Sequence, residues 1–341
     1  MDQGKTFRKI SGDLTRGGKT GDVPYGTIST IHESPLKFGL IYTGSDDGLI
    51  HVTKDGGNTW TRISDKLPQH MRVNRIIASA HAEGRVYAVL SGFQWDHFNA
   101  YVYRSDDYGN TWTPIGTDLP MEPVNVIRED PVNENLLFIG TDNGLYVSFD
   151  RGKTTMRMFN NLPAVAIHDL VIHPREKDLI VGTHGRSVYI ANIAALEQLN
   201  DSIMSKDLFV YDLNPIRQYN NYVEDDGKYK VFTATKLNLT YFSGKNEPHT
   251  VTVYTGDGGQ KLTVLRDTSE RGVNFINTEL TVDSAYAANY KEWCKTSGIE
   301  DKPAETEHGK LSFVQGEYLI EVRSASGLIS SKKVRILKPR M

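Results

Sequence analysis

The sequence has almost no cysteine and no marked excess of charge of either sign. Cys294 is the single cysteine in 341 residues, which excludes an internal disulfide and a multi-cysteine zinc site. The 39 basic and 42 acidic residues leave a formal net charge of -3. Because such a chain has no strong attraction for phosphates, we predict that nucleic acid is not a partner.

Long apolar runs are also missing. No stretch approaches the ~18 consecutive apolar residues that a membrane-spanning helix needs, so no membrane span is predicted. The first residues, MDQGKT, do not form the apolar core of a signal peptide. Glycine and tyrosine are plentiful, with 30 and 17 residues, and Val/Ile/Thr runs recur between turn residues. This composition is typical of a β-rich chain with many short strands.

Four copies of one motif organise the first 200 residues. The pattern Asp-x-Gly-x-Thr begins at Asp2, Asp55, Asp107 and Asp150, and we name these stretches the DxGxT motifs. An aromatic residue follows the first three copies, whereas Thr155 follows the last. Successive motifs are 53, 52 and 43 residues apart, about the length of one four-stranded propeller blade. The repeat therefore predicts a β-propeller.

Each DxGxT motif has the residues of a hairpin turn. The Asp carboxylate can accept backbone N–H groups of its own turn, and the glycine supplies a positive φ. The aromatic residue can fill the gap between neighbouring sheets. We therefore predict that the four motif carboxylates are structural and not catalytic.

A second element, a pair of strands joined by a tight turn, recurs between the motifs. It appears at residues 41–52, 137–147 and 179–190, with Asp, Asn and Gly or His and Gly in the turns. In the remaining copy the turn is enlarged, and residues 91–100 are expected to form a loop between two strands. A loop longer than its counterparts is a candidate for function.

The segments GTDNGLYVSFD at 140–150 and GTHGRSVYI at 182–190, with those at 120–131 and 168–175, resemble the closing blades of a known family. This family comprises the BNR or Asp-box β-propellers of sortilin-like and glycosyl-hydrolase-like bacterial proteins. The resemblance covers residues 1 to about 200. It implies that the chain is the C-terminal part of a larger propeller, and that the full-length protein is extracytoplasmic or secreted. An incomplete ring would have an exposed edge with which another chain can pair.

The fold class predicted is all-β, with about four propeller blades followed by an immunoglobulin-like β-sandwich. The domains are expected at 1–205 and 206–341, and a short helical pattern at 193–199 ends the propeller. In the second domain, alternating patterns predict strands at 236–242, 251–254, 262–265, 318–323 and 333–337. Residues 285–293 fit either a helix or an irregular insertion.

Strand alternation locates one candidate binding surface. Turns between the second and third strands of a blade point to the face opposite the DxGxT turns. Trp95, flanked by Phe93 and Phe98, can stack on a sugar ring or enter a groove of a protein partner, or its loop can pack on a neighbouring blade. The candidate ligand-binding residues are Asp47, Trp95, Asp96, His97, Asp142, His184 and Arg186.

Two hypotheses of function follow. The first is a non-catalytic extracytoplasmic module that recognises a protein or a glycan through a propeller face. The alternative is the C-terminal fragment of a glycoside hydrolase whose catalytic blades lie upstream.

Glycoside hydrolysis requires two carboxylates that flank the scissile glycosidic bond, and Asp96 with Asp47 or Asp142 is the pair available here. We expect no catalysis by this chain. We also expect no cofactor and no metal, because the Asp-rich turns at 224–227 and 257–259 lack the ligand spacing of a calcium loop.

Overall fold

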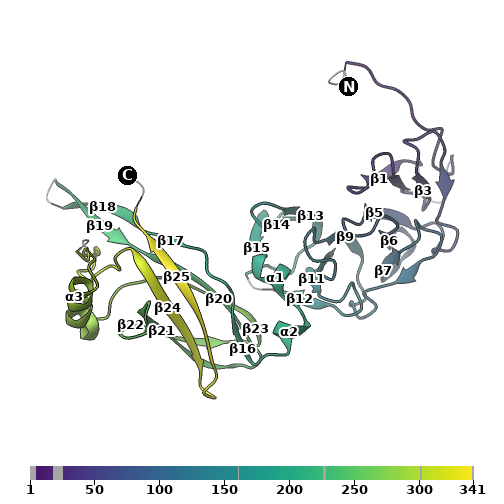
Figure 1. The fold of residues 1–341 in the computed structure, drawn as a ribbon. Coiled ribbons are helices and arrows are strands. Elements are labelled where there is room, and N and C mark those ends of the chain that lie inside the picture. The colour runs from purple at the N-terminus through teal and green to yellow at the C-terminus, as the bar shows by residue number, and fades with distance from the viewer. Residues whose placement is uncertain (1–4, 18–25, 160, 226–227, 300–301, 340–341) are drawn as a thin grey trace. The chain divides into compact units, whose positions relative to one another are not determined.

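The computed structural model describes residues 5–17, 26–159, 161–225, 228–299 and 302–339. It is an all-β structure with few short helices (Figure 1). Asp2 and part of the 224–227 turn lie outside the described residues. The chain divides into two compact units, residues 1–198 and 199–341. The domain boundary near 205 stays a prediction.

The first unit contains four antiparallel sheets, each a meander of consecutive strands. Among the described residues, three sheets have four strands and the last has three. The first sheet comprises β1 (Ile28–Glu33), β2 (Ile41–Ser45), β3 (Ile50–Thr53) and β4 (Thr61–Arg62). The second comprises β5 (Arg72–Ala78), β6 (Val86–Gly92), β7 (His97–Ser105) and β8 (Thr113–Pro114). The third comprises β9 (Val124–Glu129), β10 (Leu137–Thr141), β11 (Leu145–Ser148) and β12 (Met156–Met158), and the fourth β13 (Ile167–His173), β14 (Asp178–Thr183) and β15 (Val188–Asn192).

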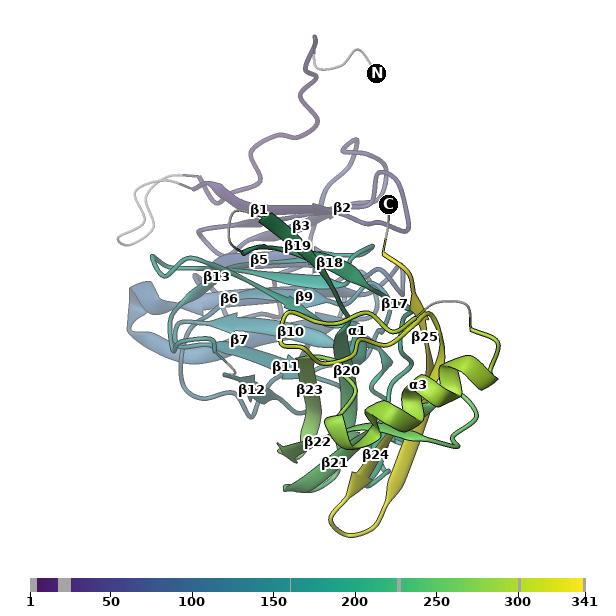
Figure 2. The same cartoon turned by 90° about the vertical axis from the view of Figure 1, so that its left-hand side faces the viewer.

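The four sheets pack face to face in chain order. Their first strands β1, β5, β9 and β13 are neighbours in succession (Figure 2). A separate apolar cluster fills each space between sheets, with Tyr42 and Ile76 in the first, Tyr87 and Ile139 in the second, and Phe138 in the third. Meander sheets stacked in this way are the blades of a β-propeller. We number them blades 1 to 4.

Each described DxGxT motif forms the turn between the third and fourth strands of its blade. Asp55 Oδ1 accepts the backbone N–H of Thr59 at 2.9 Å and the hydroxyl of Thr53 at 2.7 Å, and Oδ2 accepts the Thr59 hydroxyl at 2.7 Å. The same three bonds recur at Asp107 and Asp150. These carboxylates are therefore fully occupied within their own turns.

Each of these turns also packs on an isoleucine that precedes its blade in the chain, and for blades 2 and 3 this isoleucine follows the last strand of the preceding blade. Gly57 has a φ of +96°, and a Cβ there would lie 2.7 Å from Ile10. Gly109 and Gly152 approach Ile63 and Ile115 in the same way. The motif glycine is thus required twice, by its positive φ and by the close approach of the neighbouring blade.

The aromatic residue of the motif adds a hydrogen bond to this contact. The Trp60 indole donates to the carbonyl of Ile10 at 2.9 Å, and the Trp112 indole donates to that of Ile63 at 2.8 Å. In the last motif Thr155 makes a different contact, with its N–H donating to Asp118 at 2.7 Å. Trp112 therefore joins blades 1 and 2, and Trp60 joins blade 1 to the N-terminal segment.

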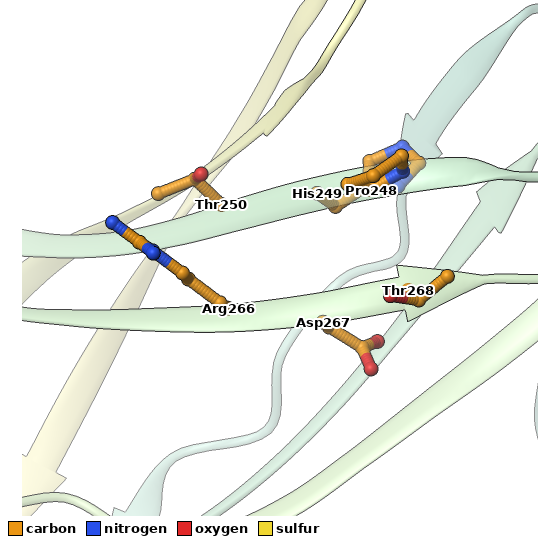
Figure 3. A pocket seen from close by; sticks show the side chains of 6 residues that line it. All are labelled: Pro248, His249, Thr250, Arg266, Asp267 and Thr268. Atoms are coloured by element: carbon orange, nitrogen blue, oxygen red, sulfur yellow. The ribbon is translucent and has the colours of Figure 1, made fainter.

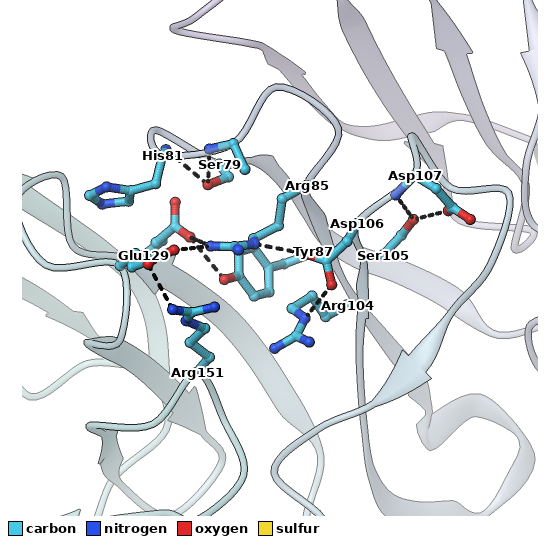
Figure 4. A network of polar contacts seen from close by, with 12 residues as sticks. Ser79, His81, Arg85, Tyr87, Arg104, Ser105, Asp106, Asp107, Glu129 and Arg151 are labelled. Atoms are coloured by element: carbon cyan, nitrogen blue, oxygen red, sulfur yellow. Dashed lines mark hydrogen bonds and ion pairs between the residues drawn. The ribbon is translucent and has the colours of Figure 1, made fainter.

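A buried polar network joins blades 2 and 3 (Figure 4). The Arg85 guanidinium, almost wholly buried, donates to Asp106 at 2.8 Å and to Glu134 at 2.9 Å, and lies 3.6 Å from the buried Glu129. The Tyr87 hydroxyl donates to Glu129 at 2.9 Å. Burial, followed by the Glu129 charge, raises the pKa of Tyr87 well above its usual range. Arg85 therefore neutralises a carboxylate that would otherwise be buried without a cation.

The second unit contains two larger sheets that share one apolar core, which includes Leu239, Val253 and Ile320. The five-stranded sheet has the order β17-β25-β24-β21-β22, the three-stranded sheet β16-β20-β23, and β18 pairs with β19. The strands are β16 (Leu208–Val210), β17 (Ile216–Arg217), β18 (Tyr219–Asp225), β19 (Lys228–Ala234), β20 (Lys236–Ser243), β21 (Glu247–Thr255), β22 (Lys261–Ser269), β23 (Gly272–Glu279), β24 (Gly316–Ser324) and β25 (Ile329–Leu337). The described residues of the whole chain form the α-helices α1 (Ala194–Gln198), α2 (Asp201–Met204) and α3 (Ala287–Thr296).

Strands were expected at five places in this unit, and β20, β21, β22, β24 and β25 contain them. The pattern did not indicate β17, β18, β19 and β23. In β23 the side chains are half-buried or exposed and none is fully buried, so the sequence carries little hydrophobic signal. Of the two alternatives for residues 285–293, the helix is found, as α3, which buries Tyr290 and Cys294.

Replacing Arg85 tests the network between blades 2 and 3. We expect Arg85→Leu to lower the free energy of unfolding by about 3 kcal/mol, because Glu129 would stay buried without its cation. Arg104→Ala is the matched control, since Arg104 also binds Asp106 but is more exposed; it should cost less than about 1 kcal/mol. Urea unfolding measures both, and equal effects would contradict the role of Arg85.

The pKa of Asp55 predicts a pH dependence. The backbone and side-chain bonds from Thr59, then that from Thr53, lower the pKa of Asp55 to about 2, from 3.8. This carboxylate therefore stabilises the fold above its unfolded pKa, and the stabilisation is lost as the pH falls toward 2. The difference in Tm between the wild type and Asp55→Asn should be largest above pH 4 and shrink below it. A difference independent of pH would contradict this assignment.

Candidate functional site

The turns between second and third strands are held by one repeated backbone bond. The residue that precedes the first strand of the blade accepts an N–H from the turn. In blade 1 the backbone N–H of Asp46 donates to the Thr27 carbonyl at 3.0 Å, and in blade 3 that of Asp142 donates to the Pro123 carbonyl at 3.1 Å. In blade 4, His184 N donates to the Ala166 carbonyl at 2.9 Å. These turns therefore occupy equivalent positions on one rim of the blades.

In blade 2 the enlarged turn is held by an indole, which binds a carbonyl two residues before the first strand, β5. β6 continues to Gly92, which pairs with His97 at the start of β7, so the predicted loop at 91–100 is shorter than expected. A 3-10 turn, η1 (Phe93–Trp95), ends at Asp96, whose φ of 58° is left-handed. The Trp95 indole donates to the His70 carbonyl at 2.8 Å. Gly48 of blade 1 packs against the backbone of His70 and Met71.

The hairpin presents three aromatic side chains to solvent. Phe93 is 59% exposed, Trp95 41% and Phe98 42%. The Phe93 and Phe98 rings meet edge to face, with centroids 5.8 Å apart. Such a cluster on a pinned hairpin offers an amphipathic platform that requires little ordering on binding. We name Phe93, Trp95 and Phe98 the aromatic hairpin.

The carboxylates expected beside it serve mainly as turn formers. Asp47 is buried, with Oδ1 accepting the Ser45 hydroxyl at 2.5 Å and Oδ2 accepting the Arg16 N–H at 2.7 Å. Asp142 Oδ1 accepts the Asn125 side-chain amide at 2.8 Å. Asp96 and His97 are exposed on the hairpin itself. The structure thus brings Asp47, Trp95, Asp96 and His97 to neighbouring turns of blades 1 and 2.

The remaining candidates lie on blades 3 and 4. Asp142 belongs to the turn of blade 3, and His184 and Arg186 belong to that of blade 4. The His184 ring lies against His168, with centroids 5.0 Å apart. In the described part of the chain, no group of three or more His, Cys, Asp or Glu side chains could hold a metal ion. Nor does any helix there have the length and apolar character needed to cross a membrane.

A polar cluster on the first strands of the blades was not found by sequence reasoning. Arg75 on β5 donates to Asp169 on β13 at 2.8 Å, and Arg128 on β9 lies 3.7 Å from the same carboxylate. Burial, then the charges of Arg128 and Arg75, lowers the pKa of His32 on β1. These residues come from four blades, so no local motif could have indicated the cluster. It links non-adjacent blades 2 and 4.

The second unit has a pocket along β21 and β22 (Figure 3). Arg266 and Asp267 project to opposite sides of their strand, as adjacent strand residues must. Asp267 accepts the Tyr241 hydroxyl at 2.7 Å, and burial together with this carboxylate raises the pKa of Tyr241. His249 is buried beside the Tyr241 ring, and its Nδ1 lies 2.9 Å from the Glu247 carbonyl. These bonds tie Asp267 and His249 to the fold.

Comparison with known proteins gives only distant structural similarity. No protein-family model matches the chain. No curated protein matches it either. The chain is similar to a GH74 xyloglucanase from Xanthomonas campestris, with TM-score 0.41 and 11% identity over 89% of this chain and 46% of that chain. A GH74 enzyme of Niastella koreensis gives TM-score 0.41 and 11% identity over 91% and 66% of the two chains. YCF48 bound to a D1 peptide gives TM-score 0.28 and 12% identity over 51% and 66%. This chain therefore spans about half to two thirds of the length of those proteins.

Replacing Trp95 tests whether its indole pins the hairpin. We expect Trp95→Ala and Trp95→Phe to speed amide hydrogen exchange of residues 92–98 several-fold, because both remove the bond to the His70 carbonyl. Phe98→Ala is the control, since it removes an exposed ring and leaves that bond. Hydrogen exchange followed by mass spectrometry measures this. Unchanged exchange in Trp95→Phe would show that ring packing, not the hydrogen bond, holds the hairpin.

Proposed function

We propose that this chain is a non-catalytic recognition module that binds a protein or a glycan through the rim that carries the aromatic hairpin. The observation that carries the proposal is the exposure of Phe93, Trp95 and Phe98 on a hairpin whose base is pinned to His70. Exposed aromatic side chains at one point of a rim are costly in water and are typical of binding surfaces. A sugar ring or an apolar side chain of a protein fits such a platform.

The carboxylates favour recognition over hydrolysis. A glycosidase needs one carboxylic acid and one carboxylate that flank the scissile bond and are free to act on it. Asp47 is buried and bonded to Ser45 and Arg16, and Asp142 is bonded to Asn125. Of the three candidate carboxylates, Asp47, Asp96 and Asp142, only Asp96 is exposed, and it lies on the hairpin. The alternative, a C-terminal part of a glycoside hydrolase, therefore needs its acids from blades outside this chain.

The family assignment belongs to the same proposal. The DxGxT turns, with their bonded carboxylates and inter-blade tryptophans, support membership of the BNR or Asp-box propellers of the sortilin-like group. The two sheets with a common core in the second unit support an immunoglobulin-like sandwich. With that membership goes an extracytoplasmic or secreted location of the protein.

The experiment is a glycan array together with a polysaccharide-hydrolysis screen, run on this chain. We expect binding without turnover, and Phe93→Ala with Phe98→Ala should weaken the binding of any captured glycan at least about tenfold. Phe38→Ala is the matched control, because Phe38 is an exposed phenylalanine in the turn between β1 and β2, at the other end of those strands.

Two results would overturn the proposal. Release of reducing sugar by this chain would make it an enzyme. Equal loss of binding in the Phe38 control would show that the captured glycan adheres to exposed aromatic residues in general and not to the hairpin.

A further inference from the structure

The aromatic hairpin is held at the carbonyl of a residue with an unusual backbone conformation. The Trp95 indole donates to the His70 carbonyl at 2.8 Å. His70 has a φ of 63°, in the left-handed region that residues other than glycine seldom adopt. Such a conformation persists only where the surrounding structure holds it in place. The position of the hairpin therefore depends on the groups that hold His70.

A turn of blade 1 holds His70 on one side. This turn joins β2 to β3 at residues 45–49, and we name it the blade 1 turn. A Cβ at Gly48 would lie 2.8 Å from the Met71 carbonyl oxygen and 3.2 Å from the backbone nitrogen of His70. The blade 1 turn therefore packs directly on the backbone that presents the His70 carbonyl.

A side-chain amide holds the chain on the other side. Gln69 immediately precedes His70. Its Nε2 donates to the Ser64 carbonyl at 3.0 Å and to the Leu67 carbonyl at 2.8 Å. Its Oε1 accepts a hydrogen bond from the Arg16 guanidinium at 2.8 Å. The donors and the acceptor of this amide are thus all used to fix the chain just before His70.

The same arginine binds the blade 1 turn. Arg16 Nε donates to the Asp47 carbonyl at 3.2 Å, and the backbone N–H of Arg16 donates to Asp47 Oδ2 at 2.7 Å. Asp47 is buried, so this contact lies inside the turn and not on its surface. Arg16 therefore bonds to both elements that hold His70, the blade 1 turn and Gln69.

Blade 3 shows how the same place is held without such an arginine. Glu122 has the position in blade 3 that His70 has in blade 2, three residues after the leucine of a Leu-Pro pair. The Glu122 carboxylate accepts the Thr141 hydroxyl at 2.8 Å and the Asn143 side-chain amide at 2.6 Å, so it binds the turn of its own blade directly. In blade 2 a backbone carbonyl does this instead, and its orientation has to be fixed by other residues.

We propose that Arg16 is a positioning residue of the aromatic hairpin. Through Gln69 and the blade 1 turn, it keeps the His70 carbonyl in the orientation that accepts the Trp95 indole. A platform that is already held in its binding conformation loses less conformational freedom on binding. Arg16 therefore strengthens recognition without contact with the ligand. This role rests on the function proposed above for the hairpin.

The first test is the local stability of the hairpin. We expect Arg16→Ala to speed amide hydrogen exchange of residues 92–98 several-fold, while exchange in blade 3 stays unchanged. Arg16→Lys keeps one charged donor and should give an intermediate rate. Arg62→Ala is the matched control, since it removes from the same blade an exposed ion pair with Asp65. Unchanged exchange of residues 92–98 in Arg16→Ala, or an equal increase in Arg62→Ala, would overturn the proposal.

The second test is whether Arg16 acts through the indole. Trp95→Ala removes the bond to the His70 carbonyl, so the addition of Arg16→Ala to this variant should not increase the exchange rate of residues 92–98 further. In a double-mutant cycle the combined effect is then smaller than the product of the two single effects. Two rate increases that multiply would mean that the residues act independently, and Arg16 would have no role at the hairpin.

The third test separates positioning from recognition itself. For a glycan that the wild type captures, Arg16→Ala should weaken the affinity at least about threefold, because the hairpin must then be ordered on binding. Arg62→Ala should bind as the wild type does. Faster exchange with unchanged affinity would overturn the role of Arg16 in recognition. If the wild type captures no glycan, glycan recognition fails, and the two exchange experiments alone decide whether Arg16 positions the hairpin.

Discussion

The structure of the first unit depends on the contact between each DxGxT turn and an isoleucine that precedes its blade in the chain. The motif carboxylate closes the turn, and the glycine allows this isoleucine to approach. In blades 1 and 2 a tryptophan indole also binds the carbonyl of the isoleucine. Burial of the sheet faces supplies most of the stabilisation, since it removes the largest apolar area from water. The turn contact determines how successive sheets are placed, because it fixes the end of one blade against the start of the next.

Repetition of this contact explains where the polar residues of the molecule gather. It places the first strands of four blades side by side, and so brings Arg75, Arg128 and Asp169 together from blades 2, 3 and 4. It also places Arg85 of blade 2 against the buried Glu129 of blade 3. On the opposite rim the same repetition aligns the turns between second and third strands. In the aromatic hairpin an indole binds the chain just before the first strand, whereas in blades 1, 3 and 4 a backbone N–H of the turn does so.

Blade 4 departs from the repeat. In blades 1 to 3 a fourth strand pairs with the third, whereas among the described residues β15 is the last strand of its sheet. Val188 and Ile190 on β15 are exposed, whereas Leu145 and Val147, at the same positions of blade 3, are buried against blade 4. In a repeat array each unit buries the face of its neighbour, which is why the same strand positions are buried in one blade and exposed in the next.

The sequence by itself determined the blades and their turns, because the DxGxT spacing and the strand alternation are local patterns that repeat four times. It located the enlarged turn of blade 2, although not its true length, since the pairing of Gly92 with His97 depends on the partner strand. It missed β23, where no strand residue is fully buried, and it could not decide between helix and irregular structure at 285–293. Only the tertiary structure decided that Trp95 anchors the hairpin to His70, that Asp47 is buried in a turn, and that residues from three blades meet around Asp169. The physical reason is that each of these depends on groups far apart in the chain, whose proximity is set by the packing of whole sheets.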